Sequence, residues 1–159
     1  MTATQKNIPF VKSAGFSLIE LLIVIAIMGT LSATAMPAYR TYISTAEMAK
    51  VDKTYHTAIK VARQEYTKNT THVAMGLQSS LPLDAAAWIE VFSGSNNSSA
   101  PDGGPAYRPG HQPNNESLPS GAVYVYFHSD HLCITRNGFY ELIALKTRIY
   151  TDRVTIEEL

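Results

Sequence analysis

Glu20 is the residue whose chemistry is hardest to reconcile with its surroundings. It is the only charged residue between Gly15 and Arg40, in a stretch that is otherwise almost entirely apolar. An unpaired carboxylate in a membrane helix costs at least about 2.5 kcal/mol, and such residues are usually paired or functional. The sequence therefore predicts that Glu20 pairs with a cation, which the nearby segment does not supply.

A second group of chemically capable side chains lies near residue 130. His128, Asp130, His131 and Cys133 are of types that bind metals or take part in nucleophilic catalysis. The spacing places the two histidines on either side of a tight turn and Cys133 along a strand. A turn cluster of this kind is more often incidental, so we predict no metal, no cofactor and no enzymatic activity, with Cys133 a buried thiol.

Composition limits the remaining classes. The 159 residues suffice for one modest domain and a hydrophobic segment, and the single cysteine excludes a disulfide within the chain. Basic and acidic residues balance at 13 each, which argues against a nucleic-acid surface.

The apolar stretch that contains Glu20 has the length of a membrane span. As a helix, the residues from Phe16 to Ala35 would extend roughly 30 Å, about the thickness of one bilayer core. The stretch is too long for the core of a signal peptide and lacks a small-residue cleavage site after it. Lys6 and Lys12 precede it, so we expect a cytoplasmic N-terminus and an exported remainder.

One long helix should carry this stretch into the domain, from Phe16 to about Lys68, where Asn69-Thr70-Thr71 is expected to stop it. Its second half alternates apolar and basic positions at helical spacing. The apolar stripe comprises Val51, Tyr55, Ile59, Ala62 and Tyr66. The residues expected on other faces are Lys50, Lys53, His56, Lys60 and Arg63.

The rest of the chain predicts a small sheet after a long, mostly irregular segment. That segment holds one short helix over Leu83–Phe92 and a polar tract over Ser93–Ser120. Three strands are expected over Ala122–His128, His131–Arg136 and Phe139–Tyr150. Turns at Ser129-Asp130 and Asn137-Gly138 would join them into an antiparallel meander that packs on the helical stripe.

The sequence Gly15-Phe16-Ser17-Leu18-Ile19-Glu20, followed by the apolar run and Pro37, resembles the class III signal of type IV pilins and pseudopilins. The resemblance is strongest from Gly15 to about Tyr42. It implies that a prepilin peptidase cleaves between Gly15 and Phe16 and that Phe16 is N-methylated. It also implies that Glu20 pairs with the α-amine of Phe16 in a neighbouring subunit and so sets the register of assembly.

The resemblance also implies an α+β pilin fold, with a long N-terminal helix on a small antiparallel meander. The segments are a leader over 1–15, a hydrophobic transmembrane and polymerisation helix over 16–39, and a globular head over 40–159. Within the head we expect an amphipathic helix over 40–68, an αβ-loop over 69–121, the meander over 122–150 and a tail over 151–159. Gly29 and Pro37 mark a weak point of the helix, either a kink or a segment that melts on assembly.

The implied function is that of a structural subunit of a type IV pilus, used for adhesion, twitching motility or DNA uptake. The implied partners are further copies of the chain, the prepilin peptidase, the inner-membrane assembly platform and the membrane, without a specific nucleic-acid site. The subunit would lie in the inner membrane before assembly and at the cell surface afterwards. A minor pilin and a pseudopilin of a type II secretion system remain as alternatives. In the latter, Asp152, Glu157 and Glu158 would bind calcium, although a solvated acidic tail is favoured because EF-hand-like spacing is absent.

Overall fold

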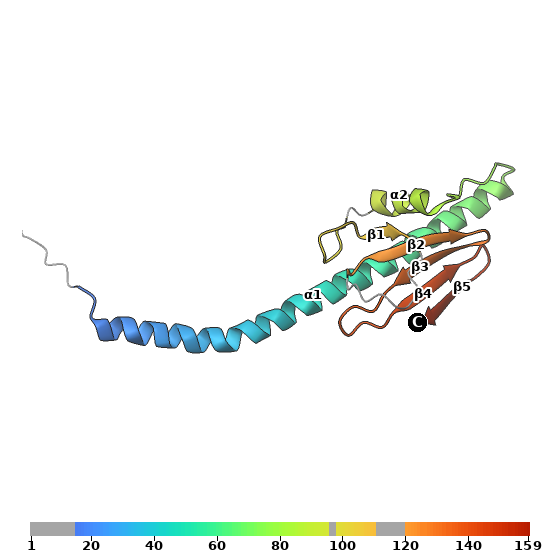
Figure 1. Cartoon of the computed structure of the whole chain (residues 1–159). Helices are drawn as coiled ribbons and strands as arrows, with labels where there is room; N and C mark the ends of the chain where they lie inside the picture. Colours follow the sequence, from blue (N-terminus) through green and yellow to red (C-terminus); the bar gives the residue numbers. More distant parts are fainter. Residues whose placement is uncertain (1–14, 96–97, 111–119) are drawn as a thin grey trace, which may run out of the picture. The chain divides into compact units, whose positions relative to one another are not determined.

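The computed structural model describes residues 15–95, 98–110 and 120–159 (Figure 1). Most of the predicted leader, residues 1–14, lies outside the described residues. The chain divides into two compact units, Met1–Thr41 and Tyr42–Leu159. Among the described residues, the helices are α1 over Leu18–Ala74 and α2 over Ala85–Ser95. The strands are β1 (Tyr107–Pro109), β2 (Val123–His128), β3 (His131–Arg136), β4 (Leu145–Ile149) and β5 (Val154–Glu158).

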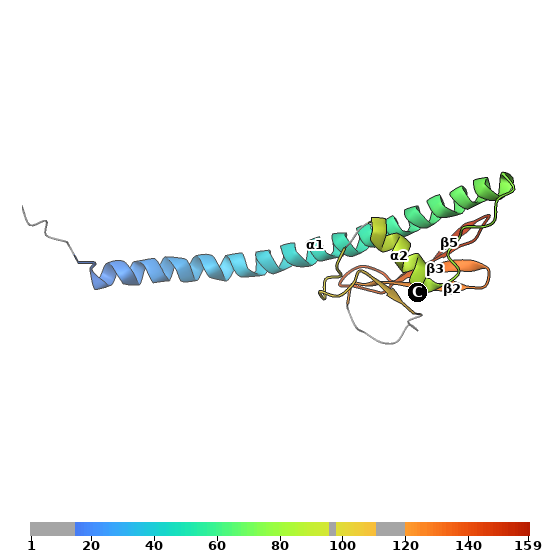
Figure 2. The same ribbon diagram turned by 90° about the horizontal axis from the view of Figure 1, so that it is seen from above.

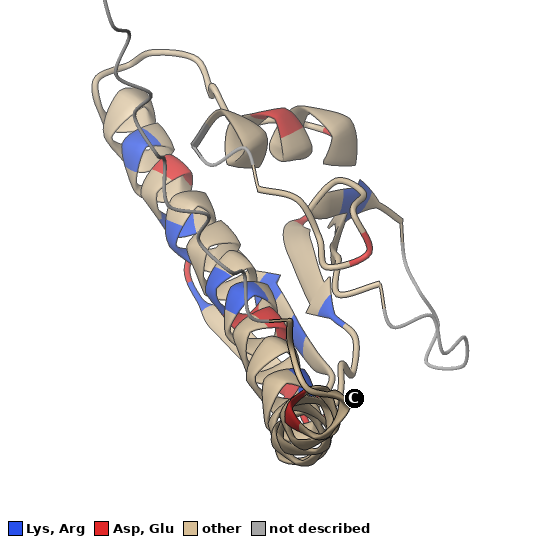
Figure 3. Ribbon diagram, turned by 90° about the vertical axis from the view of Figure 1, so that its left-hand side faces the viewer, with Lys and Arg blue, Asp and Glu red and all other residues tan. Residues whose placement is uncertain are grey.

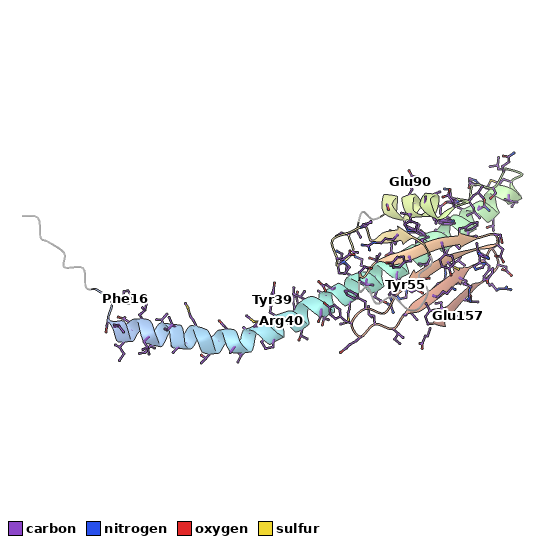
Figure 4. All side chains as sticks on the ribbon, in the orientation of Figure 1. Phe16, Tyr39, Arg40, Tyr55, Glu90 and Glu157 are labelled. Carbon is purple, nitrogen blue, oxygen red and sulfur yellow. The ribbon has the colours of Figure 1, made fainter. Side chains whose placement is uncertain are left out.

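The part of α1 in the second unit has the predicted buried stripe. Val51, Tyr55, Ile59, Ala62 and Tyr66 are all buried, and the five predicted basic positions are exposed. Figure 4 shows Tyr55 where α1 passes the sheet. From Tyr55 onward, the stripe packs with apolar residues of β2, β3 and β4 in one core cluster. The prediction of an amphipathic helix that packs on a sheet is therefore confirmed.

The end of α1 differs from the prediction. The helix continues past Asn69 to Ala74, because the buried Asn69 side chain accepts hydrogen bonds from Ser79 Oγ (3.0 Å) and Ser80 N (2.9 Å) in the segment that follows. The actual stop is Gly76, which has a positive φ of 76°. Leu77 N donates to the carbonyl of His72 at 3.1 Å, as in a Schellman cap.

The sheet has the strand order β1-β2-β3-β4-β5 and is mixed, because β1 is parallel to β2. The other pairs are antiparallel, and the predicted Ser129-Asp130 turn joins β2 to β3. The α+β class is therefore confirmed, and so is an antiparallel meander over residues 122–150, which contains β2, β3 and β4. The sheet as a whole is larger and mixed, because it also includes β5 and the parallel strand β1, which were not predicted. β1 lies in a tract with Pro109 and Gly110 that shows no alternation, which is why the sequence did not indicate a strand there.

The predicted hairpin at Asn137-Gly138 is wrong. β3 pairs Arg136 with Leu145, so the strands are joined by residues 137–144 and not by two residues. Two interactions hold this longer connection: Phe139 is buried, and Arg136 Nη2 donates to the carbonyl of Ile143 at 2.8 Å. Tyr140 takes a positive φ of 51° in its turn.

The predicted tail is also wrong, because its residues 154–158 form the edge strand β5. Val154 packs against the core cluster, and Glu157 makes an ion pair with Arg148 of β4. Alternation of Val154 and Ile156 with Thr155 and Glu157 is the strand signal, but it is short and ends in two glutamates.

A row of aromatic side chains places α2 on the same face of the sheet as α1 (Figure 2). The row runs from Tyr66 of α1 to Trp88 and Phe92 of α2 and to Tyr107 of β1, with ring centroids 5.7, 5.7 and 5.3 Å apart. Trp88 and Phe92 are fully buried. The short helix predicted over Leu83–Phe92 is thus confirmed, displaced toward the C-terminus.

These buried aromatic groups predict a loss of stability in alkali. Burial raises the pKa of Tyr107 to about 12 and raises the pKa of Tyr55 and Tyr66, and of Cys133, as well. In the unfolded chain these groups release protons from about pH 9–10, so between that pH and the folded pKa values the unfolded state binds fewer protons. Stability should be flat up to about pH 8.5 and should fall at higher pH. Urea unfolding of the full chain in detergent, followed by fluorescence of Trp88, measures this; constant stability up to pH 11 would contradict it.

Candidate functional site

The backbone at the start of α1 leaves the Gly15–Phe16 bond outside the helix. Residues 15–17 precede the helix, and among the described residues the first carbonyl to accept a helical hydrogen bond is that of Ser17, from Glu20 N (3.1 Å) and Leu21 N (3.2 Å). Phe16 is 82% exposed and is labelled at the beginning of the helix in Figure 4. An exposed peptide bond outside a helix is accessible to a protease.

A side chain at Gly15 would meet no other atom of the described residues. A Cβ built there has nothing within 4 Å among them. Any requirement for glycine at this position must therefore come from a partner that binds the segment and not from the fold.

We therefore expect Gly15→Leu to separate stability from processing. The free energy of unfolding of the second unit should change by less than about 0.5 kcal/mol, as for other exposed substitutions. The full-length precursor should nevertheless accumulate in the membrane, because leucine would obstruct the peptidase. Immunoblots of membrane fractions and Trp88 unfolding curves test the two halves; normal cleavage of Gly15→Leu would contradict the assignment of the bond.

Glu20 occupies the first turn of α1 and is exposed. None of the ion pairs between described residues involves it, so the chain offers its carboxylate no cationic side chain there. The positive end of the helix dipole favours a carboxylate in this turn. Ser17 and Glu20 also have the Ser-x-x-Glu spacing of a capping box, a helix-start signal that our sequence reasoning missed.

The remainder of α1 in the first unit is an apolar helix on which no other described segment packs. Its large apolar side chains are 41–82% exposed, from Val24 at the low end to Leu18 at the high end. Among the described residues, α1 is the one helix long and apolar enough to cross a membrane, with a window of mean hydropathy 2.1 and no buried residue. Between Phe16 and Tyr39, Glu20 is the one charged residue.

The helix is unbroken at the predicted weak point. α1 passes through Gly29 and Pro37 without interruption, and a Cβ at Gly29 would meet nothing within 4 Å. The hydroxyl groups of this stretch donate to main-chain carbonyls of the same helix: Thr30 to Ile27 (2.9 Å), Thr34 to Leu31 (3.0 Å) and Thr41 to Pro37 (3.2 Å). Polar groups satisfied in this way are suited to an apolar medium.

The cluster near residue 130 has structural contacts. His131 Nδ1 lies 2.6 Å from Asp130 Oδ1, and its ring stacks on Tyr150 with centroids 4.7 Å apart. Cys133 is fully buried, and burial raises the pKa of its thiol, which makes the thiolate rarer and the residue less reactive. In the part of the chain that the structure describes, no three His, Cys, Asp or Glu side chains converge to hold a metal ion.

Comparison with known proteins identifies the segment that contains Gly15, Phe16 and Glu20. Residues 11–36 match the family model described as the prokaryotic N-terminal methylation motif. "Fimbrial protein Q" and "Type IV major alpha-pilin" of Moraxella bovis are each 60% identical over 37 residues, 23% of this chain and 24% and 23% of the relative. "Fimbrial protein" of Neisseria meningitidis serogroup B is 35% identical over 86 residues, 50% of this chain and 51% of the relative.

The similarity is concentrated at the N-terminus, and the chain spans between a quarter and about half the length of these curated relatives. No solved structure matches the chain significantly. The residues matched by the family model include Gly15, Phe16, Glu20 and Gly29, and Pro37 follows directly after them. The α+β fold has the long helix and small sheet expected of a pilin. In its methylation motif, its pilin relatives and its fold, the chain is similar to the type IV pilins.

Proposed function

We propose that the chain is the structural subunit of a type IV pilus and that it polymerises through the apolar part of α1. The observation that carries this proposal is a helix with large apolar side chains 41–82% exposed and, in its first turn, a carboxylate that makes no ion pair with any described residue. Lipid would cover such a helix before assembly, and neighbouring copies of the same helix would cover it afterwards.

Processing would supply the missing cation. A prepilin peptidase cleaves between Gly15 and Phe16 and Phe16 is then N-methylated, which leaves an amine one helical turn from Glu20. The amine of a neighbouring subunit, at a staggered height, neutralises the carboxylate and sets the register. The leader then comprises residues 1–15, the polymerisation helix 16–39 and the head 40–159.

The proposed path runs from the inner membrane to the cell surface. The subunit enters the inner membrane through the apolar helix, meets the assembly platform there and leaves as part of a fibre. Gly29 and Pro37 form the part of the helix where local unwinding costs least. The fibre serves adhesion, twitching motility or DNA uptake, and the names of the relatives, among them a major pilin, favour the main subunit over a minor one. As a structural subunit, the chain would catalyse no reaction.

Mass spectrometry of sheared surface fibres tests the proposal. We expect the chain to be the most abundant protein, with an N-terminal peptide that begins at methylated Phe16 and lacks residues 1–15. Fibres without this chain, or a surface form that retains the leader, would overturn it.

A further inference from the structure

A hollow lies in the second unit between α1 and the edge strand β5. Ile156 forms one wall with its side chain 55% exposed, and Ile59 contributes apolar surface from the helix. The remaining lining residues belong to α1: His56, Lys60, Arg63, Gln64, Thr67, Lys68 and Thr71. The hollow thus combines an apolar base with basic side chains.

The charge of this hollow is mostly uncompensated. Among the described residues, Lys60 and Arg63 make no ion pair, whereas Lys68 is paired with Glu65 at 3.4 Å. Figure 3 shows Lys and Arg side by side along the second half of α1. A ligand of this hollow should therefore be acidic and partly apolar.

The strand beside the hollow has a free backbone edge. β5 is the last strand of the sheet and pairs only with β4 in the described part of the chain. Arg153 O accepts from Tyr150 N (2.8 Å) and Leu159 N donates to Ala144 O (3.0 Å), so the odd-numbered residues face β4. By the alternation of antiparallel ladders, Val154, Ile156 and Glu158 direct their N–H and C=O groups away from the sheet. An extended peptide is the ligand that satisfies such an edge.

We propose that the occupant is a second copy of this chain, whose β5 pairs antiparallel with the first β5 about a two-fold axis at Ile156. β5 has the composition that the hollow requires, because it carries the apolar Ile156 and the acidic Glu158. An isologous contact needs a surface that complements itself, and here one strand provides both the edge and the acidic ligand.

The register places opposite charges together. With Ile156 opposite its counterpart, Glu158 of one copy lies opposite Val154 of the other. Arg63 lines the hollow at Ile156 and also the adjoining one at Val154, so the incoming Glu158 carboxylate lies beside Arg63. The side chains of Val154, Ile156 and Glu158 share the α1 face of the sheet, since Leu145, Thr147 and Ile149 are their β4 partners. The continuous sheet that results buries the exposed Ile156 of both copies.

This contact goes beyond assembly of a single fibre. The two-fold axis makes the 42–74 segments of the two α1 helices run in opposite directions, whereas subunits of one fibre all point the same way. The contact therefore joins separate fibres side by side in antiparallel orientation, or dispersed subunits in solution. It does not require the proposed polymerisation, because it lies wholly within the second unit.

Disulfide trapping tests the pairing of two β5 strands. The full chain is kept in detergent with about one chain per micelle, so that the apolar helices do not bring two copies together. Directly opposite residues of a hydrogen-bonded antiparallel pair have Cα atoms about 5.5 Å apart, within reach of a disulfide. Under mild oxidation Ile156→Cys should give covalent dimers. The matched control is Ile143→Cys, an isoleucine 57% exposed in the β3–β4 connection, and both variants keep the buried Cys133. Equal dimer yields from the two variants would overturn the proposal.

Charge reversal in the Ile156→Cys background tests the register. Glu158→Lys and Arg63→Glu should each lower the dimer yield by about fivefold, and the combination should restore it. A combined variant that dimerises no better than either single one would overturn the pairing of Glu158 with Arg63. Cells with Glu158→Lys should carry as many surface fibres as the parent, but fewer of the fibres should be bundled side by side. Bundling at the parent level would contradict the inferred contact between fibres. If cells make a normal number of fibres but Ile156→Cys forms no covalent dimers, the contact between β5 strands is refuted and the proposed function is not. If the parent chain forms no fibres, the proposed function is refuted and the contact is not.

Discussion

Replacing Glu20 with alanine is expected to remove surface fibres while the pool of cleaved subunits in the membrane stays normal. In the isolated subunit Glu20 has no ion pair with any described residue, so its removal costs the monomer only the small contribution of a carboxylate to the start of the helix. The substitution instead relieves the helix of a carboxylate that costs at least about 2.5 kcal/mol in lipid. Assembly fails because a new subunit no longer has a charge to align with the amine of Phe16.

Counting fibres and membrane-bound subunits in the same cells decides between an assembly role and an insertion role. Glu20→Gln serves as the matched control, since it keeps the shape and a hydrogen-bond acceptor but not the charge, and it should give an intermediate fibre count. Abundant fibres in Glu20→Ala would show that the carboxylate does not guide assembly. A depleted membrane pool would instead make Glu20 a residue needed for insertion or stability.

The features that the sequence predicts correctly are those written in local patterns. The stripe from Val51 to Tyr66 follows helical periodicity over four turns, and each of its five residues is buried. The Ser129-Asp130 turn needs only two residues between two strands. The N-terminal site is likewise contiguous, so Gly15, Phe16 and Glu20 are found without knowledge of the fold.

The features that the sequence did not predict depend on contacts between distant segments. Asn137-Gly138 is a strong local hairpin signal, but burial of Phe139 and the bond from Arg136 to the Ile143 carbonyl select a longer connection. Three residues at 107–109 become a strand only because β2 offers an edge. In the same way, Asn69 is a helix breaker by composition, yet its side-chain bonds to Ser79 and Ser80 keep it in α1.

A buried arginine gives the clearest case of a residue whose importance no local pattern reveals. The Arg136 side chain is 4% exposed and makes an ion pair with Asp52 of α1, whose side chain is 42% exposed. Its other contacts are the Ile143 carbonyl at 2.8 Å and the face of Tyr55, with 5.4 Å between the guanidinium carbon and the ring centroid. Tyr55 in turn shares a 2.5 Å hydrogen bond with Thr147 of β4. This cluster fastens α1 to the sheet.

Asp52→Ala should therefore destabilise the second unit by about 3 kcal/mol, although Asp52 is the more exposed partner. Its loss leaves a guanidinium buried without a counter-charge, which is the costly way to break such a pair. Arg136→Met should cost less, about 1–2 kcal/mol, because it removes the buried charge and the remaining carboxylate reaches water and lies 3.6 Å from His56 Nε2. The matched control is Glu65→Ala, which breaks the exposed Glu65–Lys68 pair and should cost less than about 0.5 kcal/mol.

Urea unfolding of the full chain in detergent measures all three variants through Trp88, the only tryptophan and a fully buried one. The double variant Asp52→Ala/Arg136→Met is the most informative, because without the guanidinium the absence of Asp52 should no longer matter. Its stability should lie within about 0.5 kcal/mol of Arg136→Met alone, whereas independent contributions would add. Two results would contradict this: losses of stability that add in the double variant, or an Asp52→Ala variant as stable as Glu65→Ala. Either would show that the carbonyl and ring contacts stabilise Arg136 and that the ion pair is incidental. If Asp52→Ala is instead less stable than Arg136→Met, the charge that α1 supplies to Arg136 is what fastens the helix to the sheet.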